Sequence, residues 1–257
     1  MSPGLPSTQT AGLLMKTARG PTGTILCFTI SCAGREERRF LGFCKGNFRP
    51  TSLAPHEGKS CTGRTVSKLF FQLQTELGPT LRAGDLRKCD QRIAEALRGL
   101  PISPFHIALG LHFTNPPDAV AKQFDAFFRR ERDRFPIAAA YTETNGFDIN
   151  PNRWYFDFFA YDTYGGTDDF DWLSDWTSDP WPNMTLTGME ALQAVYASTA
   201  FRDHSHRDAS YVTSLLVVSR FQLLMAQACT FMNELRFPFL STGHDFEYIS
   251  EVQQISI

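Results

Sequence analysis

The stretch YVTSLLVVSRFQLLMAQACTFM, residues 211–232, decides the fold, because it is the only long apolar run in the chain of 257 residues. Its length would suit a membrane span, but it contains Arg220, Gln222, Gln227 and several hydroxyl groups. Such side chains are costly in lipid, whereas a protein core accommodates them through hydrogen bonds. We therefore predict a long helix, from about residue 209 to 234, buried in a soluble protein with no membrane partner.

Shorter periodic segments precede this helix. Residues 66–77 and 85–97 have apolar positions at helical spacing and predict a helical hairpin, with Gly78 and Pro79 ending the first helix. Residues 117–134 predict a third helix with a stripe of phenylalanines. Residues 105–113 alternate between apolar and other residues and predict a strand, and residues 137–142 and 154–163 predict two more strands joined by turns. The predicted fold class is α+β, with a small antiparallel sheet of about three strands packed by helices.

The amino-terminal part differs from the rest of the chain. Residues 1–62 have no sustained periodicity, are interrupted by Pro and Gly, and contain one β-rich run at 24–31. We predict that residues 1–62 are poorly ordered and that residues 63–257 form a single α+β domain.

Charge is divided unequally along the chain. Residues 1–136 contain 20 Lys and Arg against 11 Asp and Glu, a net charge of +9, while residues 137–257 contain 5 against 16, a net charge of −11. This asymmetry is typical of chains whose halves dock onto each other, onto a second copy or onto separate charged partners.

Five of the six cysteines lie before residue 90, but no two have C-x-x-C spacing. The first 21 residues contain an apolar run of only three residues, which is too short for a signal peptide. We therefore expect reduced, unpaired cysteines and a cytoplasmic location.

The most conspicuous pattern is an acidic segment with interleaved tryptophans. Its residues are Asp168, Asp169, Asp171, Trp172, Asp175, Trp176, Asp179 and Trp181. A calcium loop starting at Asp169 would require glycine at its sixth position, where Ser174 stands. Aromatic anchors surrounded by charge are typical of protein interfaces, so we interpret these eight residues as a partner-binding surface. The alternative is a solvated acidic face over an aromatic core.

A second pattern is the run D-H-S-H-R-D at 203–208, in which His204, His206 and Asp208 form H-x-H-x-D. Two such imidazoles and a carboxylate can converge on a divalent ion. The run resembles part of the H-x-H-x-D-H motif of the metallo-β-lactamase family. However, Ala209 stands at the last position and the run lies between predicted helices, so the resemblance does not transfer the activity.

Carboxylates also lie on or beside the predicted strands. A hydrolytic pair drawn from Glu143, Asp148, Asp157 and Asp162 would require a defined separation between the two carboxyl groups. His244 and Asp245 near the carboxyl end are further candidate ligands. No nucleotide-binding motif is present, so no cofactor is predicted.

The function that the sequence favours is binding of a basic protein partner by the acidic tryptophan segment. Nucleic acid is excluded as a ligand of that segment, because both are negatively charged. The competing hypothesis is a metal-dependent hydrolase that uses His204, His206 and Asp208. Without a complete catalytic motif, the sequence leans away from an enzyme.

Overall fold

The computed structural model describes residues 67–147 and 150–252, all of which fall within one compact unit. The predictions for residues 1–62, including the β-rich run 24–31, lie outside these described residues. The elements are the α-helices α1 (Lys68–Arg82), α2 (Leu86–Arg98), α3 (Pro117–Arg132), α4 (Glu190–Ala197) and α5 (Arg207–Cys229), the short 3-10 helices η1 (Pro104–Gly110), η2 (Asp171–Ser174), η3 (Thr199–Arg202) and η4 (His204–His206), and the strands β1 (Ala139–Asn145), β2 (Tyr155–Tyr161), β3 (Met184–Thr185), β4 (Phe239–Gly243) and β5 (Ser250–Val252).

The strands form one mixed sheet with the order β3-β2-β1-β4-β5. β1 pairs antiparallel with β2, as predicted, and parallel with β4. The predicted α+β class is confirmed, but the predicted sheet of about three antiparallel strands is wrong, because the described sheet has five strands and one parallel pair. Local turn signals reveal hairpins, whereas a parallel pair requires a long connection that includes a helix.

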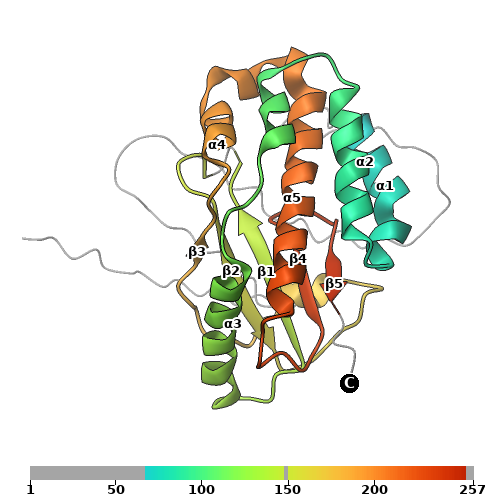
Figure 1. The fold of residues 1–257 in the computed structure, drawn as a ribbon. Coiled ribbons are helices and arrows are strands. Elements are labelled where there is room, and N and C mark those ends of the chain that lie inside the picture. Colours follow the sequence, from blue (N-terminus) through green and yellow to red (C-terminus); the bar gives the residue numbers. More distant parts are fainter. Residues whose placement is uncertain (1–66, 148–149, 253–257) are drawn as a thin grey trace, which may run out of the picture. The chain divides into compact units, whose positions relative to one another are not determined.

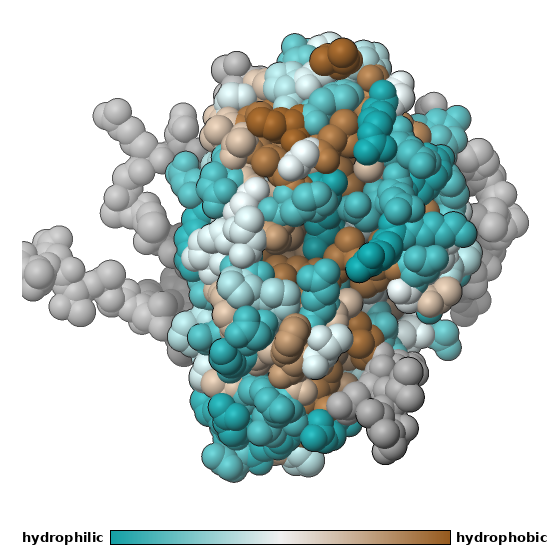
Figure 2. Space-filling view, in the orientation of Figure 1, coloured by the Kyte–Doolittle hydropathy of each residue, from teal (hydrophilic) through white to brown (hydrophobic). Residues whose placement is uncertain are grey.

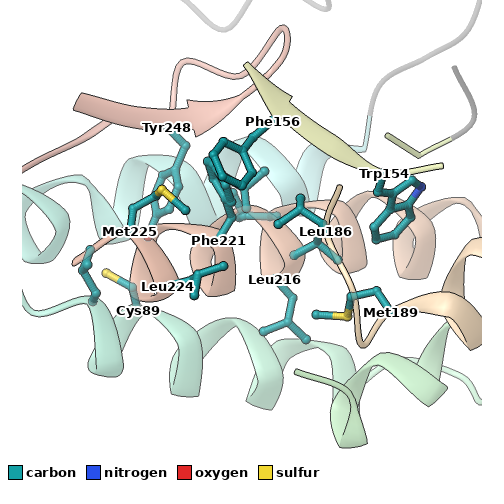
Figure 3. Packing of buried hydrophobic residues seen from close by; sticks show 14 of the residues in the cluster. Cys89, Trp154, Phe156, Leu186, Met189, Leu216, Phe221, Leu224, Met225 and Tyr248 are labelled. Carbon is teal, nitrogen blue, oxygen red and sulfur yellow. The ribbon is translucent and has the colours of Figure 1, made fainter. Parts of the chain in front are cut away.

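The helices pack against one face of this sheet. Figure 1 shows α5 crossing the sheet, with α3 on one side and α1 and α2 on the other. The rings of Phe221 and Phe156 lie 5.6 Å apart. Figure 3 shows both side chains between α5 and the sheet. Both side chains are fully buried. The main core therefore lies between the helix layer and this face of the sheet.

The long helix is buried despite its polar residues. The Arg220 guanidinium, 5% exposed, donates hydrogen bonds to Asp90 and to the backbone carbonyls of Ala108 and Leu111. The Gln222 amide donates to two carbonyls of the β4–β5 region. Hydrogen bonding offsets the cost of burying these groups. Within the described residues, the helical stretch 204–229 is long and apolar enough to cross a membrane, but 72% of its apolar window is buried inside the protein.

The predicted strand at 105–113 is instead largely the 3-10 helix η1. Pro104 stands in its first turn, and Ser103 and His106 form a reciprocal cap. Phe105 and Ala108, three residues apart, are buried, which fits the three-residue period of a 3-10 helix. The alternation of apolar residues, which has the two-residue period of a strand, therefore predicted the wrong structure for this segment.

The helix side of the molecule exposes some apolar residues. In Figure 2 brown patches appear toward the end of the molecule where Figure 1 places η1 and α4. Ile102 is 93% exposed and Ile107 is 44% exposed. Single exposed apolar residues are common on soluble proteins and do not by themselves identify a partner.

Candidate functional site

The predicted acidic segment lies on the sheet face opposite the helices. Side chains of residues 162–178, the covering segment, pack on this face. The contacts form a small second core of Phe170, Trp172 and Leu173 against Tyr141, Tyr161 and Leu240. The ring of Trp172 lies 4.9 Å from that of Tyr161, and its Nε1 donates to the carbonyl of Gly166. Trp172 therefore serves mainly to attach the covering segment to the sheet.

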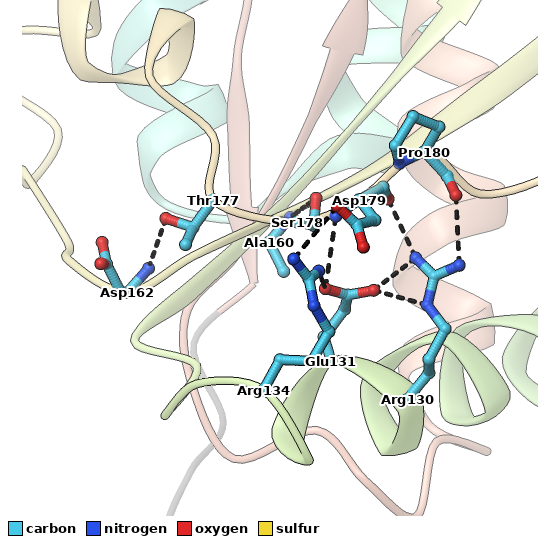
Figure 4. A network of polar contacts seen from close by, with 9 residues as sticks. All are labelled: Arg130, Glu131, Arg134, Ala160, Asp162, Thr177, Ser178, Asp179 and Pro180. Carbon is cyan, nitrogen blue, oxygen red and sulfur yellow. Dashed lines mark hydrogen bonds and ion pairs between the residues drawn. The ribbon is translucent and has the colours of Figure 1, made fainter.

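A buried carboxylate holds the chain just after the covering segment. Glu131, 0% exposed, pairs with the guanidinium groups of Arg130 and Arg134 and accepts a hydrogen bond from the N–H of Asp179, as Figure 4 shows. Arg130 also donates to the carbonyl of Asp179, and its guanidinium lies 4.6 Å from the centre of the Trp181 ring. Trp181 is therefore also used in packing, against α3.

Part of the predicted surface remains open to solvent. The exposed carboxylates of the covering segment that belong to the predicted set are those of Asp168, Asp169, Asp171 and Asp175. None of these four forms an ion pair within the described residues, whereas Asp179 pairs with Arg134. Trp176 is 50% exposed, and its ring lies 5.2 Å from that of Phe159. We call Asp168, Asp169, Asp171, Asp175 and Trp176 the acidic surface.

Two carboxylates face each other beside the acidic surface. Glu143 on β1 is the direct cross-strand partner of Asp157 on β2. Tyr141 donates a hydrogen bond to Glu143 (2.7 Å), and the Asn145 amide donates to Asp157 (2.7 Å). Burial, followed by the charge of Glu143, raises the pKa of Asp157. Of the four candidate carboxylates on or beside the strands, Glu143 and Asp157 are thus brought together, while Asp148 lies outside the described residues.

The imidazole of His244 lies at the same end of the sheet as Glu143 and Asp157. The Nδ1 atom of His244, just after β4, lies 2.9 Å from Oε1 of Glu143. The hydrogen bond to Glu143 outweighs desolvation and raises the pKa of His244 to about 9. His244 is therefore an imidazolium at neutral pH and neutralises the charge of Glu143. Both residues are candidates in the sequence, but the sequence does not reveal their pairing, because they are 101 residues apart.

The His244–Glu143 pair should make stability depend on pH. The folded pKa, about 9, exceeds the ordinary value of 6.5, so the stabilisation is complete below pH 6.5 and is lost as pH rises through 9. Because the His244 side chain is 45% exposed, we expect a loss of only about 1 kcal/mol. Urea unfolding between pH 6 and 10 should show this loss in the wild type and not in His244→Gln. The control variant His204→Gln, changed at an exposed histidine, should behave as the wild type. If the free energy of unfolding changes with pH in the same way in all three proteins, the His244–Glu143 pair is not its cause.

Two residues at this end of the sheet have a left-handed backbone. Phe147, which follows β1, has a φ of 57°, and Asp245, which follows β4, has a φ of 64°. Non-glycine residues with positive φ store strain and occur often at functional sites. Because β1 and β4 are parallel, both residues lie beyond the carboxyl ends of adjacent strands, where open sheets with parallel strands commonly bind ligands.

The H-x-H-x-D run lies at the amino-terminal end of α5. Asp203 accepts a hydrogen bond from the backbone N–H of Ser205, and His206 lies 3.9 Å from Asp203. Asp208 lies in the first turn of α5, where an acid interacts favourably with the helix dipole. Within residues 67–147 and 150–252, no three His, Cys, Asp or Glu side chains are grouped to hold a metal. The metal hypothesis thus remains a prediction from sequence without added support.

A groove of about 740 Å³ lies beside the covering segment, between α1 and the β4–β5 region. Its lining includes Thr167 and Phe170 of the covering segment, the half-exposed Phe71 of α1, and the carboxylates Glu247 and Glu251. The lining also includes Arg82, so the groove brings two carboxylates and one guanidinium next to the covering segment.

Comparison with known proteins identified no matching family model, no similar curated protein and no similar solved structure.

Proposed function

We propose that this protein binds a basic segment of a partner protein through the acidic surface. The observation that carries the proposal is the set of four exposed carboxylates that form no ion pair within the described residues, together with the half-exposed Trp176 of the same covering segment. Trp176 is the only exposed residue among the four tryptophans, all of which are described. Tryptophan is enriched among the hot spots of protein interfaces, and polar groups form the rim around them.

The attachment of the covering segment supports the same proposal. The ring of Tyr161 packs under Trp172, and the hydroxyl of Tyr161 donates to the carbonyl of Leu173. The hydroxyl of Ser178 accepts a hydrogen bond from the N–H of Ala160. A surface held in place in this way loses little conformational entropy when a partner binds, so more of the interaction energy contributes to affinity.

The sign of the charge selects the partner. The carboxylates attract Lys and Arg side chains and repel phosphate groups, which favours a basic protein over nucleic acid. The adjacent groove contributes Glu247 and Glu251 against Arg82, a net charge of −1. We expect association to weaken as ionic strength rises, because exposed charges are screened by salt.

A defined peptide tests the proposal directly. We expect acetyl-Gly-Lys-Gly-Arg-Gly-Lys-Gly-Arg-amide to bind and to shift the fluorescence of the exposed Trp176. The double variant Asp171→Asn/Asp175→Asn should bind about tenfold more weakly, which corresponds to about 1.4 kcal/mol. Titration calorimetry at low and high salt gives the affinities.

The control variant removes two carboxylates from another part of the surface. Glu95 and Asp133 are exposed and lie on the helix side, so Glu95→Gln/Asp133→Asn should bind the peptide about as well as the wild type. If the two double variants lose affinity equally, the attraction is a property of net charge and not of the acidic surface. Absence of peptide binding to the wild type would reject the proposal.

A further inference from the structure

A strip of aromatic rings and one carboxylate borders the acidic surface. Tyr155, Asp157 and Phe159 alternate along β2 and therefore share the sheet face that carries the covering segment. Side chains two residues apart on a strand are roughly 7 Å apart. Trp176 leans on Phe159, with 5.2 Å between the ring centroids. The carboxylate of Asp157 thus lies between two aromatic rings and within reach of a ligand that contacts Trp176.

Asp157 forms no ion pair with the described residues, although His244 and Arg153 both attract its charge from a greater distance. Glu143, directly opposite, has the same sign, and like charges in this position are destabilising. His244 pairs with Glu143, so it neutralises that carboxylate. The nearby Arg153 donates to Thr185 and Asn183 and forms no ion pair with Asp157. A cation from outside the described residues would relieve this repulsion.

One arginine of this protein, Arg130, shows how an aromatic ring and a carboxylate hold such a cation together. The guanidinium of Arg130 lies 4.6 Å from the centre of the Trp181 ring and at the same time pairs with the carboxylate of Glu131. The planar guanidinium can stack on an aromatic ring while its N–H groups bind a carboxylate in the same plane. The compact ammonium of lysine lacks this planar geometry. Trp176 and Asp157 offer the same two kinds of group, with no arginine from the described residues between them.

We propose that the basic partner is anchored by an arginine side chain whose guanidinium stacks on Trp176 and pairs with Asp157. The inference rests on the proposed function, because it assigns a specific anchor to the same interaction. The exposed aspartates attract basic segments of any composition, while the Trp176–Asp157 position selects arginine over lysine. The partner is thus a protein segment rich in arginine, and one arginine contributes most of the selectivity.

Two matched peptides test the anchor. We expect acetyl-Gly-Arg-Gly-Arg-Gly-Arg-Gly-amide to bind the wild-type protein about tenfold more tightly than the peptide with lysine at each arginine position. Asp157→Asn and Trp176→Ala should each reduce this preference to about twofold or less, mainly through weaker binding of the arginine peptide. Asp171→Asn should weaken both peptides by the same factor and preserve the preference. Titration calorimetry at constant salt gives all the affinities.

The outcomes separate the two proposals. Equal affinity of the wild type for both peptides, or an unchanged preference in Asp157→Asn, overturns the arginine anchor and leaves the acidic surface standing. Failure of both peptides to bind rejects the proposed function and the anchor with it. Thermal unfolding checks that the variants fold, and Asp157→Asn should be at least as stable as the wild type, because it removes the repulsion from Glu143.

Discussion

Replacing Phe124 with alanine is expected to lower the free energy of unfolding by about 4 kcal/mol, in the middle of the range for truncating a buried phenylalanine. Phe124 is fully buried on α3, and its ring lies 4.5 Å from that of Phe158 and 5.0 Å from that of Phe239. These two rings belong to strands on either side of β1. Truncation would therefore open a cavity where α3 meets the centre of the sheet and would remove several aromatic pairs at once.

Chemical unfolding followed by circular dichroism measures this loss. Phe231→Ala provides the control, because Phe231 is 54% exposed and its truncation should cost less than about 1 kcal/mol. The denaturant m-value should stay constant if the folded state remains compact. A loss below about 2 kcal/mol for Phe124→Ala would show that the core relaxes around the cavity or that α3 packs more loosely than described.

Glu131→Gln is expected to lower the free energy of unfolding by about 3 kcal/mol, at the lower end of the range for breaking a buried ion pair. The buried carboxylate pairs with both Arg130 and Arg134. Glutamine keeps the shape of the side chain but leaves Arg130 without an anion and Arg134 with only the exposed carboxylate of Asp179. We take the lower end because both arginine side chains are more than a third exposed and can be partly hydrated.

The same substitution should also loosen the end of the covering segment, because Asp179 is held through Glu131 and Arg130. Limited proteolysis should then cleave near residues 178–181 in Glu131→Gln before it cleaves there in the wild type. Asp133→Asn, at the C-cap of α3, changes an exposed carboxylate and should alter neither stability nor cleavage. Unchanged unfolding of Glu131→Gln would mean that water replaces the carboxylate at no net cost.

The spacing of apolar residues in the sequence was sufficient to predict the helices but not the sheet. The helical spacing at 85–97 predicted α2, which the structure describes as Leu86–Arg98. The first helix was predicted to end at residue 77, before Gly78 and Pro79, yet α1 continues to Arg82, because Leu81 is buried and fixes the last turn. β4 was missed because its five residues are all buried and so show no alternation. β3 and β5 contain two and three residues, too few to give a pattern.

The candidate site was only partly predictable for a related reason. The eight residues of the acidic tryptophan segment were visible in the sequence as a pattern of composition. Composition does not distinguish Trp172, whose side chain packs on the sheet, from Trp176, whose side chain is exposed. That difference arises from the fold of 162–178 over the sheet. Glu143 and Asp157 were named as carboxylates near the strands, but their pairing depends on the register of β1 with β2. The register follows from the whole buried face and not from either residue.

The parallel pairing of β1 with β4 also determines how the chain must be assembled. During synthesis β1 and β2 leave the ribosome together and can form a hairpin at once, but the strand that completes the other side of β1 is made about a hundred residues later. Until then one side of β1 presents free backbone N–H and C=O groups, which invite pairing with another nascent chain. The long crossover through α5 places this protein among slowly folding topologies. Its yield in cells should therefore depend on chaperone capacity more than its final stability alone would suggest.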